Sequence, residues 1–345
     1  NKDGLIEEVA NDTPRLDYTN STCPSLLLEP TVTNNFTYSQ DYSQSVWTKS
    51  NSTITSFVTI SPNGELNASL LTSTGSNGGL FRFASWTTTQ RTISFFVKKD
   101  NSETVQIYNA SSSTNNVVFN LDTGVVISEG GSMTGVIKSY SNNWYRISAT
   151  HTATGSQTFG IKPETLKSVY IWGGQMEENS YETSYVPTTN TSVTRFKDIC
   201  KEGGDSTLFD ITEGSFFVDV NSFLPNNVLR EINLSDGQLA NRLIIRFQEN
   251  NQNLRFFSSG GLDRYETVDM TKRIKALVTF KLNEVKIYIN GILKFTDTSF
   301  TVPTGLDRVN YGNRLALTNF FQGEVHDTRV YNKVLTQAEA IKLTT

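Results

Sequence analysis

The chain has 345 residues, of which 19% are charged, 37% hydrophobic and 11% aromatic, and its formal net charge is −4. This length exceeds what one hydrophobic core usually holds, so two domains are expected. The acidic balance and the scattered basic residues argue against a nucleic-acid partner, and no apolar run approaches the roughly 20 residues of a membrane-spanning helix. Because the chain opens on Asn1, we expect a fragment of a longer protein.

The first 30 residues show no periodic pattern. Pro14, Pro24 and Pro30 disfavour regular structure there. The short apolar run Leu26-Leu27-Leu28 is suited to packing against a neighbouring element. We therefore predict an extended N-terminal segment over residues 1–30.

Residues 31–190 alternate apolar and polar side chains in short runs, as half-buried strands do. Turn clusters such as Ser61-Pro62-Asn63-Gly64 separate the runs, and no ten-residue helical period interrupts them. A sandwich of about ten antiparallel strands is expected. The runs are Val58/Ile60, Phe81/Phe83, Ile93/Phe95/Val97, Val105/Ile107, Val117/Phe119, Met133–Tyr140, Trp144–Thr152 and Lys167–Trp172.

A polar stretch rich in Pro, Thr and Asn follows a strand break at Gly173-Gly174. It leads to a predicted linker over residues 191–206 and a second β-sandwich over residues 207–345. The strands expected in this second domain are Gly214–Asn221, Arg242–Phe247, Leu254–Phe257, Ile274–Phe280, Val285–Ile289, Ile292–Phe295 and Gly323–Tyr331.

Two local signals in the second domain are specific. Asn290-Gly291 between two apolar runs predicts a hairpin with a type I′ turn, whose two central residues need φ > 0. Thr336 with Glu339 three residues later forms a capping box, which predicts one short C-terminal helix. The predicted fold class is all-β, with two tandem jelly-roll or β-sandwich domains and one short C-terminal helix.

Aromatic residues are the first candidates for a sugar site, because a flat apolar ring can cover the C–H face of a sugar. Trp86 lies at a strand end beside a polar turn, so it is the candidate for an exposed platform. Core packing is the alternative for Trp86 and the favoured interpretation for Trp144 and Trp172, which lie within strands. Trp47 is expected to cap an edge of the sandwich.

Arg264 and Tyr265 are the second candidates for ligand contact. They follow the turn residues 258–263 and are expected in a loop, where binding residues are common. Together with Arg230, Arg242 and Arg255 they offer the mixture of side chains that a polar glycan or acidic sugar would use. Solvated strand faces account for the same residues.

No catalytic or metal-binding constellation appears. The carboxylates Glu177, Glu178, Glu284, Glu324 and Asp327 form no recognised pair for glycoside hydrolysis. The two histidines, His151 and His326, stand outside any zinc motif, and Gly-x-Ser-x-Gly is absent. We therefore predict a protein without catalytic residues or metal ligands.

Calcium is the one cofactor for which the sequence offers a route, because loop Asp, Asn and backbone oxygens are its usual ligands. The segments 233–237 and 219–221 could supply them, although turn formation explains both equally well. The two cysteines, Cys23 and Cys200, flank the first domain. A disulfide between them and two buried free thiols both fit this spacing, and free thiols are favoured.

Several segments resemble modules of bacteriophage tail and virion-appendage proteins. The residues that carry the resemblance are Gly4–Glu7, Pro14–Tyr18, Cys23–Pro30, Tyr38–Tyr42 with Trp47, Asn143–Ile147, Gly173–Glu177 and Thr183–Thr188. In these proteins the first module is similar to carbohydrate-binding-module jelly rolls. The ending Phe321–Val325 with Val330–Thr336 resembles the closing strand of concanavalin A-like (laminin G-like) domains.

The resemblance implies a non-catalytic, lectin-like virion protein from a phage of Bacteroidetes-like hosts. Its expected role is host attachment, as part of a tail fibre or another appendage on the particle surface. The implied partners are a host surface polysaccharide and other virion proteins, and a homo-oligomer, by analogy a homotrimer, is expected. A structural spacer or capsid-decoration module is the alternative, and a glycan depolymerase is the third hypothesis.

Overall fold

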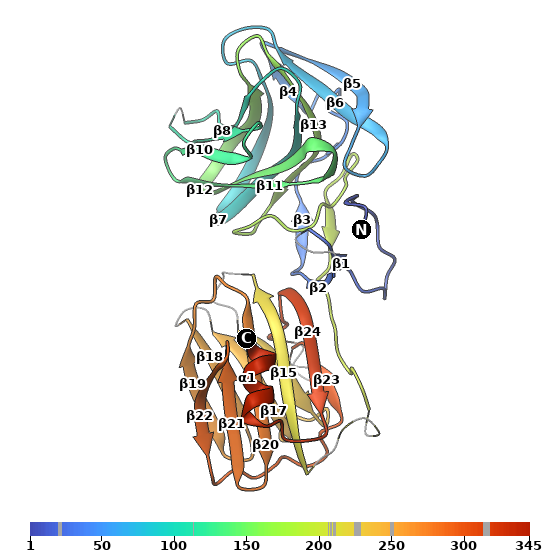
Figure 1. Ribbon diagram of the computed structural model, residues 1–345. Helices are drawn as coiled ribbons and strands as arrows, with labels where there is room; N and C mark the ends of the chain where they lie inside the picture. The colour runs from blue at the N-terminus through green and yellow to red at the C-terminus, as the bar shows by residue number, and fades with distance from the viewer. Residues whose placement is uncertain are drawn as a thin grey trace. The chain divides into compact units, whose positions relative to one another are not determined.

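Strands account for nearly all of the regular structure in the computed structural model of this protein (Figure 1). Among the described residues the one α-helix is α1 (Gln337–Thr344), which confirms the prediction of an all-β protein with one short C-terminal helix. The chain divides into unit 1, residues 1–8 and 31–196, and unit 2, residues 9–30 and 197–345. The structure describes residues 1–19, 23–112, 114–205, 207, 209, 212–223, 229–248, 252–312 and 318–345, with the side chains of 84–89, 153, 154 and 156 outside that description.

Unit 2 is a sandwich of two antiparallel sheets. One sheet has seven strands in the order β1-β2-β24-β15-β20-β21-β22, and the other has five in the order β19-β18-β17-β16-β23. The strands of the first are β1 (Leu16–Asp17), β2 (Ser25–Leu28), β24 (Gly323–Tyr331), β15 (Glu213–Ser222), β20 (Ile274–Lys281), β21 (Glu284–Ile289) and β22 (Ile292–Asp297). Those of the second are β19 (Leu262–Thr267), β18 (Asn253–Ser258), β17 (Arg242–Gln248), β16 (Arg230–Ser235) and β23 (Arg308–Asn310).

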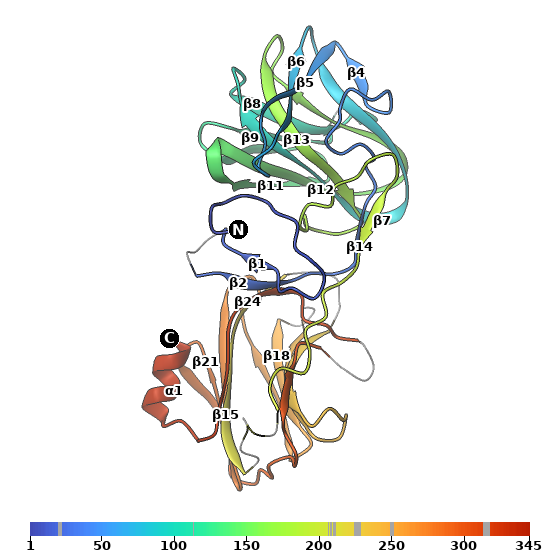
Figure 2. The same ribbon diagram turned by 90° about the vertical axis from the view of Figure 1, so that its right-hand side faces the viewer.

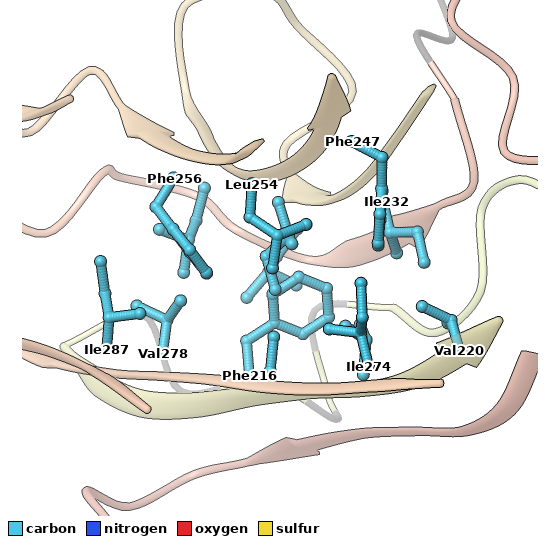
Figure 3. Close-up of a cluster of buried hydrophobic side chains, with 14 of the residues drawn as sticks. Phe216, Val220, Ile232, Phe247, Leu254, Phe256, Ile274, Val278 and Ile287 are labelled. Atoms are coloured by element: carbon cyan, nitrogen blue, oxygen red, sulfur yellow. The ribbon is translucent and has the colours of Figure 1, made fainter. Parts of the chain in front are cut away.

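The core of unit 2 lies between these sheets. Every second residue of each strand points inward, so the apolar residues of the two inner faces meet (Figure 3). Figure 3 shows Phe216, Ile274 and Val278 from the seven-stranded sheet opposite Leu254 and Phe256 from the five-stranded sheet. All five side chains are buried. This burial is the main favourable contribution to the stability of unit 2.

The segment predicted as extended, residues 1–30, contributes two strands to unit 2. Strand β2 pairs with β24 through Leu26 and Val325, and Leu28 is buried in the core, so the apolar run does pack against a neighbour. Arg15 anchors the same segment, because its Nη1 donates to Glu29 Oε2 at 2.7 Å and its Nε donates to Asp198 Oδ1 at 3.1 Å.

The two local predictions for unit 2 are confirmed. The β21–β22 hairpin turns through Asn290 and Gly291, whose φ angles are 47° and 79°. At the start of α1, the Thr336 hydroxyl accepts a hydrogen bond from the Glu339 backbone amide at 3.3 Å, and the Glu339 carboxylate accepts one from the Thr336 amide at 2.8 Å. The helix covers one outer face of the sandwich, that of the seven-stranded sheet (Figure 2), where it packs on Phe217, Leu277 and Tyr288.

The expectation of two buried thiols is wrong for Cys23, which is exposed. Cys200 is half-buried and packs against the core of unit 2. Its burial raises the pKa of the thiol, and the nearby Asp198 carboxylate adds to this effect.

Unit 1 is built around two long strands, β7 (Gly79–Lys99) and β12 (Trp144–Pro163), which pair along most of their length. The other strands are β3 (Val32–Asn34), β4 (Thr48–Ser50), β5 (Ser52–Ile60), β6 (Leu66–Ser73), β8 (Thr104–Asn109), β9 (Asn116–Asn120), β10 (Val125–Glu129), β11 (Met133–Ser139), β13 (Ser168–Glu177) and β14 (Val193–Arg195). The main sheet has the order β10-β9-β8-β12-β7-β13-β6-β5, with β11 on β12 and β4 on β7, and β3 pairs separately with β14.

Each half of a long strand has its own neighbour. The first half of β12 pairs with β11 and its last residues pair with β8, while β7 pairs first with β4 and then with β13. The runs Phe81/Phe83 and Ile93/Phe95/Val97, predicted as separate strands, therefore belong to one strand. Likewise β13 does not break at Gly173-Gly174 but continues to Glu177 with a shift in register. Gly173 has φ +59°, and a Cβ there would lie 2.9 Å from the Phe96 ring.

Three of the four tryptophans lie in the core of unit 1. Trp144 and Trp172 are each 1% exposed, as predicted. Trp47 is also 1% exposed, so its side chain is part of the core. It packs between Phe36 and Tyr42, with ring centroids 5.0 and 5.1 Å away, and its Nε1 donates to Tyr38 O at 3.0 Å.

A buried polar layer joins β12 to the segment that follows β13. Glu177 is fully buried, and its Oε1 accepts hydrogen bonds from Gln175 Nε2 at 2.7 Å and from the Thr183 amide at 2.9 Å. Arg146 donates from Nη1 to Thr183 O at 2.6 Å and from Nη2 to Ser94 Oγ at 3.0 Å. These residues belong to the segments that carry the resemblance to virion proteins. Their role in unit 1 is to hold the fold.

Glu182 completes this layer. Its carboxylate accepts from Ser148 Oγ at 2.9 Å and forms an ion pair with Lys138 at 2.6 Å. Burial acts to raise the pKa of Glu182, but the charges of Lys138 and Arg146 and the hydrogen bond from Lys138 outweigh it, so the pKa lies below its ordinary value. The charged form of Glu182 therefore stabilises the folded unit.

This shift predicts a pH-dependent loss of stability. A carboxyl whose pKa is lower in the folded state contributes stability above its unfolded pKa, about 4.3, and loses it as the pH falls through the folded pKa. We expect Glu182→Gln to lower the free energy of unfolding by about 2 kcal/mol at pH 7. The difference from the unchanged protein should shrink steadily below about pH 4.3. Thermal unfolding between pH 3 and pH 7 measures this.

Glu178→Gln is the matched control, because the Glu178 side chain is 51% exposed where it pairs with Arg91. Its stability should follow that of the unchanged protein across the range. A Glu182→Gln difference that stays constant with pH would contradict the role assigned to Glu182.

Candidate ligand-binding face

The outer face of the five-stranded sheet in unit 2 is the candidate for ligand contact. Its partner sheet has part of its outer face covered by α1, which packs on the side of β15 and β21 away from β18 (Figure 2). On the five-stranded sheet, alternation sends Leu254 and Phe256 into the core and sends Arg255 and Phe257 outward. The outward residues of β17–β19 are therefore mostly polar or aromatic, whereas every residue of β16 is buried.

The strand register arranges these outward residues in rows across the sheet. In one row Tyr265 pairs with Arg255, Arg255 with Arg246, and Arg246 with Glu231. In the next row Asp263 pairs with Phe257, Phe257 with Ile244, Ile244 with Asn233, and Asn233 with Asn310. Directly opposed residues lie about 5 Å apart, so each row is continuous.

Tyr265 is the exposed aromatic ring of this face. It is 45% exposed, and the Arg255 guanidinium lies 5.4 Å from its ring centroid and 4.9 Å from that of Phe257. Arg255 is held by Asp263, which accepts from Nε at 2.8 Å and from Nη2 at 2.9 Å. These hydrogen bonds raise the pKa of Arg255 and lower that of Asp263. Because Asp263 holds Arg255, the position of the guanidinium group beside the Tyr265 ring is fixed.

The loop predicted for Arg264 and Tyr265 is wrong, because both lie in strand β19. The turn ends at Gly261, earlier than expected. Strand alternation then sends the two neighbours to opposite faces. Arg264 lies 5.2 Å from the ring of Phe295 in the seven-stranded sheet and pairs with Glu266 at 2.7 Å. The structure therefore does not bring Arg264 and Tyr265 together on one surface.

A buried carboxylate organises the neighbouring part of the face. Glu231 is fully buried, and its Oε2 accepts from Arg246 at 3.0 Å (Nε) and 2.7 Å (Nη2). Arg242 Nη1 lies 3.6 Å from the other oxygen, Glu231 Oε1. Burial lowers the pKa of Arg242, Glu231 offsets part of this, and repulsion from Arg246 adds to it. Sequence reasoning named Arg242 but missed Glu231 and Arg246, because only the fold reveals a buried charge.

Trp86, the first candidate for an exposed platform, lies in β7 opposite Gly155. Its side chain is outside the part of the chain that the structure describes. Its role as a platform therefore remains a prediction.

The carboxylates considered for catalysis are bound in other roles. Glu177 lies in the buried layer of unit 1, and Glu284 forms a 2.8 Å ion pair with Lys286. Glu324 Oε2 lies 3.7 Å from His326 Nε2 in β24, and Asp327 pairs with Arg329 at 2.6 Å. None of these contacts sets two carboxylates across a cleft, as glycoside hydrolysis requires.

Within the described ranges, one serine–histidine contact is found, between Ser132 Oγ and His151 Nδ1 at 2.9 Å. Nucleophilic catalysis also needs backbone amides free to stabilise an oxyanion. Here the Ser132 amide donates to Asn115 Oδ1 and the Met133 amide donates to Gly130 O. This contact closes the turn before β11 and offers no oxyanion site on those two amides.

The aspartates in the segments considered for calcium binding form an ion pair or hydrogen bonds within the protein. Asp219 pairs with Arg273 through two contacts of 2.5 and 2.6 Å. Asp236 accepts hydrogen bonds from the Gln238 amide and from Asn241 Nδ2, as a turn residue does. Across the described residues, no group of three or more His, Cys, Asp and Glu side chains is placed to hold a metal ion, and no helix is long and apolar enough to cross a membrane.

Comparison with known proteins finds a family match for the second unit. Residues 215–340 match the laminin G-like family model described as the concanavalin A-like lectin/glucanases superfamily. Those residues form a concanavalin A-like domain. The resemblance inferred from the closing strand is thereby confirmed. A search of curated proteins gives no match.

Several solved structures resemble the chain at the level of fold. One is the CBM40 module of the Ruminococcus gnavus IT-sialidase, also solved with α2,3-sialyllactose, which is 16% identical over 43% of this chain and 95% of its own, with a TM-score of 0.35. Another is domain 4 of AbnA, a GH43 extracellular arabinanase from Geobacillus stearothermophilus in complex with arabinotriose, at 15% identity, 49% and 84% coverage and a TM-score of 0.36. At such scores the likeness assigns no ligand to this chain.

The buried charges of the candidate face predict a large effect on stability. Glu231→Gln keeps the shape of the side chain but removes the charge that Arg246 and Arg242 share. Breaking a buried ion pair in this way costs about 3–5 kcal/mol. We expect a correspondingly lower thermal midpoint for unit 2, measured by calorimetry on the full chain.

Asp263→Asn is the control on the same face. Its pair with Arg255 is half-exposed, so its loss should cost no more than about 1 kcal/mol. If the two variants lower the midpoint equally, Glu231 does not hold the face as described.

Proposed function

We propose that this protein is a non-catalytic, glycan-binding part of a phage virion appendage that attaches the particle to a host surface polysaccharide. The observation that carries the proposal is the outer face of β17–β19. There an exposed Tyr265 ring, fixed by Arg255, adjoins a row of arginines. A flat ring beside fixed hydrogen-bond donors suits the apolar and hydroxyl faces of a sugar.

The concanavalin A-like domain supports the glycan-binding half of this proposal. The virion half rests on the resemblance of the segments quoted above, from Gly4–Glu7 to Thr183–Thr188. In this proposal the protein lies on the surface of the extracellular particle and assembles with other virion proteins, as a homo-oligomer that the analogy makes a trimer.

A structural role for unit 1 is the second candidate. Trp144, Arg146, Met176 and Glu177 belong to the resembling segments, and all are buried in the core or the polar layer of unit 1. Such residues build a fold and do not contact a ligand. Unit 1 would then be a spacer or decoration module, with recognition left to unit 2.

Binding of the full chain to surface polysaccharides of Bacteroidetes strains tests the proposal. We expect saturable binding without release of reducing ends. Tyr265→Ala should weaken it at least about tenfold, as loss of a central aromatic contact does. Arg264→Ala, on the opposite face of the same strand, should leave it unchanged.

Other outcomes separate the alternatives. Release of reducing ends would establish a depolymerase instead. Loss of binding in Trp86→Ala with no effect of Tyr265→Ala would place the site in unit 1. No binding to any polysaccharide of the panel by the folded chain would favour the structural module.

A further inference from the structure

The arginines on the candidate face have more hydrogen-bond donors than the described residues satisfy. Arg242 Nη1 is a buried atom with no hydrogen-bond partner among the described residues. Arg246 contacts Glu231 through Nε and Nη2, and Arg255 contacts Asp263 through Nε and Nη2. An arginine carries five N–H donors and remains charged in proteins, so each of these three side chains has donors left to offer.

The guanidinium groups of Arg242 and Arg246 both lie at the carboxylate of Glu231. Arg242 and Arg246 both lie within 3.6 Å of the Glu231 carboxylate, one at each oxygen. Glu231 is fully buried, whereas the side chains of Arg242 and Arg246 are 14% and 15% exposed. The carboxylate therefore lies beneath, and each arginine side chain is partly open to solvent, although Arg242 Nη1 itself is buried.

The charges of Glu231, Arg242 and Arg246 do not balance. One carboxylate faces two guanidinium groups, and an excess buried charge is costly unless a counter-charge or hydrogen bonds compensate it. The two buried atoms of these side chains without a hydrogen-bond partner among the described residues, Glu231 Oε1 and Arg242 Nη1, face each other at 3.6 Å as an ion pair, so the uncompensated charge is the positive charge of the second guanidinium group. Other carboxylates on or beside this face are already bound, Asp263 by Arg255 and Asp307 by Arg308 at 2.6 Å. Among the described residues, no second carboxylate forms an ion pair with Arg242 or Arg246.

We propose that Arg242 and Arg246 form an anion subsite, and that the ligand of this face is an acidic glycan whose carboxylate or sulfate group binds there. This rests on the proposed function, and it names the class of sugar. Planar guanidinium groups bind such anions with paired hydrogen bonds. Tyr265 lies two strands away from Arg246, about 10 Å, so the ligand is an oligosaccharide that spans from the aromatic ring to the anion subsite.

The subsite can be tested with small probes on the full chain. Arginine Nε–Hε signals in NMR spectra report on each guanidinium group directly. We expect methyl glucuronide and inorganic sulfate, at constant ionic strength, to shift the signals of Arg242 and Arg246. Methyl glucoside, the neutral match of the glucuronide, should leave them in place.

The informative variant is Arg242→Gln, because it preserves the Arg246–Glu231 pair and therefore the fold, which a thermal midpoint verifies. It should weaken glucuronide binding about tenfold or more, as loss of a charge-assisted hydrogen bond does. Arg242→Lys keeps the charge but loses the paired hydrogen-bond geometry. Its affinity for the glucuronide should therefore lie between that of Arg242→Gln and that of the unchanged protein. Arg264→Gln, an arginine on the opposite face, is the matched control and should bind as the unchanged protein does.

The outcomes distinguish the two proposals. Equal shifts with glucuronide and glucoside, or no shift with either anion, would overturn the anion subsite. Binding of neutral polysaccharides that is insensitive to Arg242→Gln would overturn the acidic class while glycan binding stands. Anion binding that Arg242→Gln abolishes, in a chain that binds no polysaccharide, would keep the subsite and overturn the proposed function.

Discussion

The alternation of side chains along a strand is the constraint on which the candidate face depends. In unit 2 one residue of each neighbouring pair enters the core and the next faces out. Leu254 and Phe256 thereby fix where Arg255 and Phe257 must point. The apolar contacts between the sheets hold the register, and a slip of one residue would exchange the core with the candidate face. The positions of the outward arginines are therefore a consequence of core packing.

The two units bury carboxylates with different results. In unit 1, the Glu177 carboxylate accepts from Gln175 and Thr183, and Glu182 is bound by Lys138 and Ser148. Arg146 Nε is buried in this layer without a hydrogen-bond partner among the described residues, but Arg146 is only 4% exposed. The layer therefore rigidifies the core and has no open edge to offer a ligand. In unit 2 one carboxylate, Glu231, serves two arginines, and Arg242 Nη1 makes no hydrogen bond within the described structure. An incomplete network at a surface is a place where a ligand can complete it.

Local signals predicted the parts of this fold that local chemistry decides. The hairpin at Asn290-Gly291 and the helix start at Thr336 depend on a few adjacent residues, and both are found. Strand β16 (Arg230–Ser235) is not evident from the sequence, because it begins with two charged residues and then alternates apolar and polar ones, as a half-solvated strand does, although all six are buried. The pairing of β2 with β24 joins residues about 300 positions apart. No local pattern encodes that contact.

The candidate site was predicted less well than the fold, for a related reason. Tyr265 was chosen as a loop residue and is exposed on a strand, whereas its neighbour Arg264 faces the other side. Whether a residue is a ligand contact depends on the face it occupies, and a shift of one residue in the end of a turn reverses that face. Burial of Glu231 was likewise invisible, since a charged residue in a strand is normally exposed.

The residues that specify the fold and those that form the candidate face are largely separate in this chain. In unit 1 Trp144, Arg146, Met176 and Glu177 are buried in the core or the polar layer. In unit 2 the outward side chains of Arg242, Arg255 and Tyr265 contribute little to the core. Packing between the two sheets therefore does not restrict which residue types occupy these positions. Glu231 and Arg246 are the exception, because their pair is buried and required for stability. The face thus combines one fixed ion pair with surrounding positions that can be exchanged, and the ion pair determines where on the sheet the donors stand. A ligand anion at that place would interact with the same charges that stabilise the sheet, so binding and the stability of unit 2 are coupled.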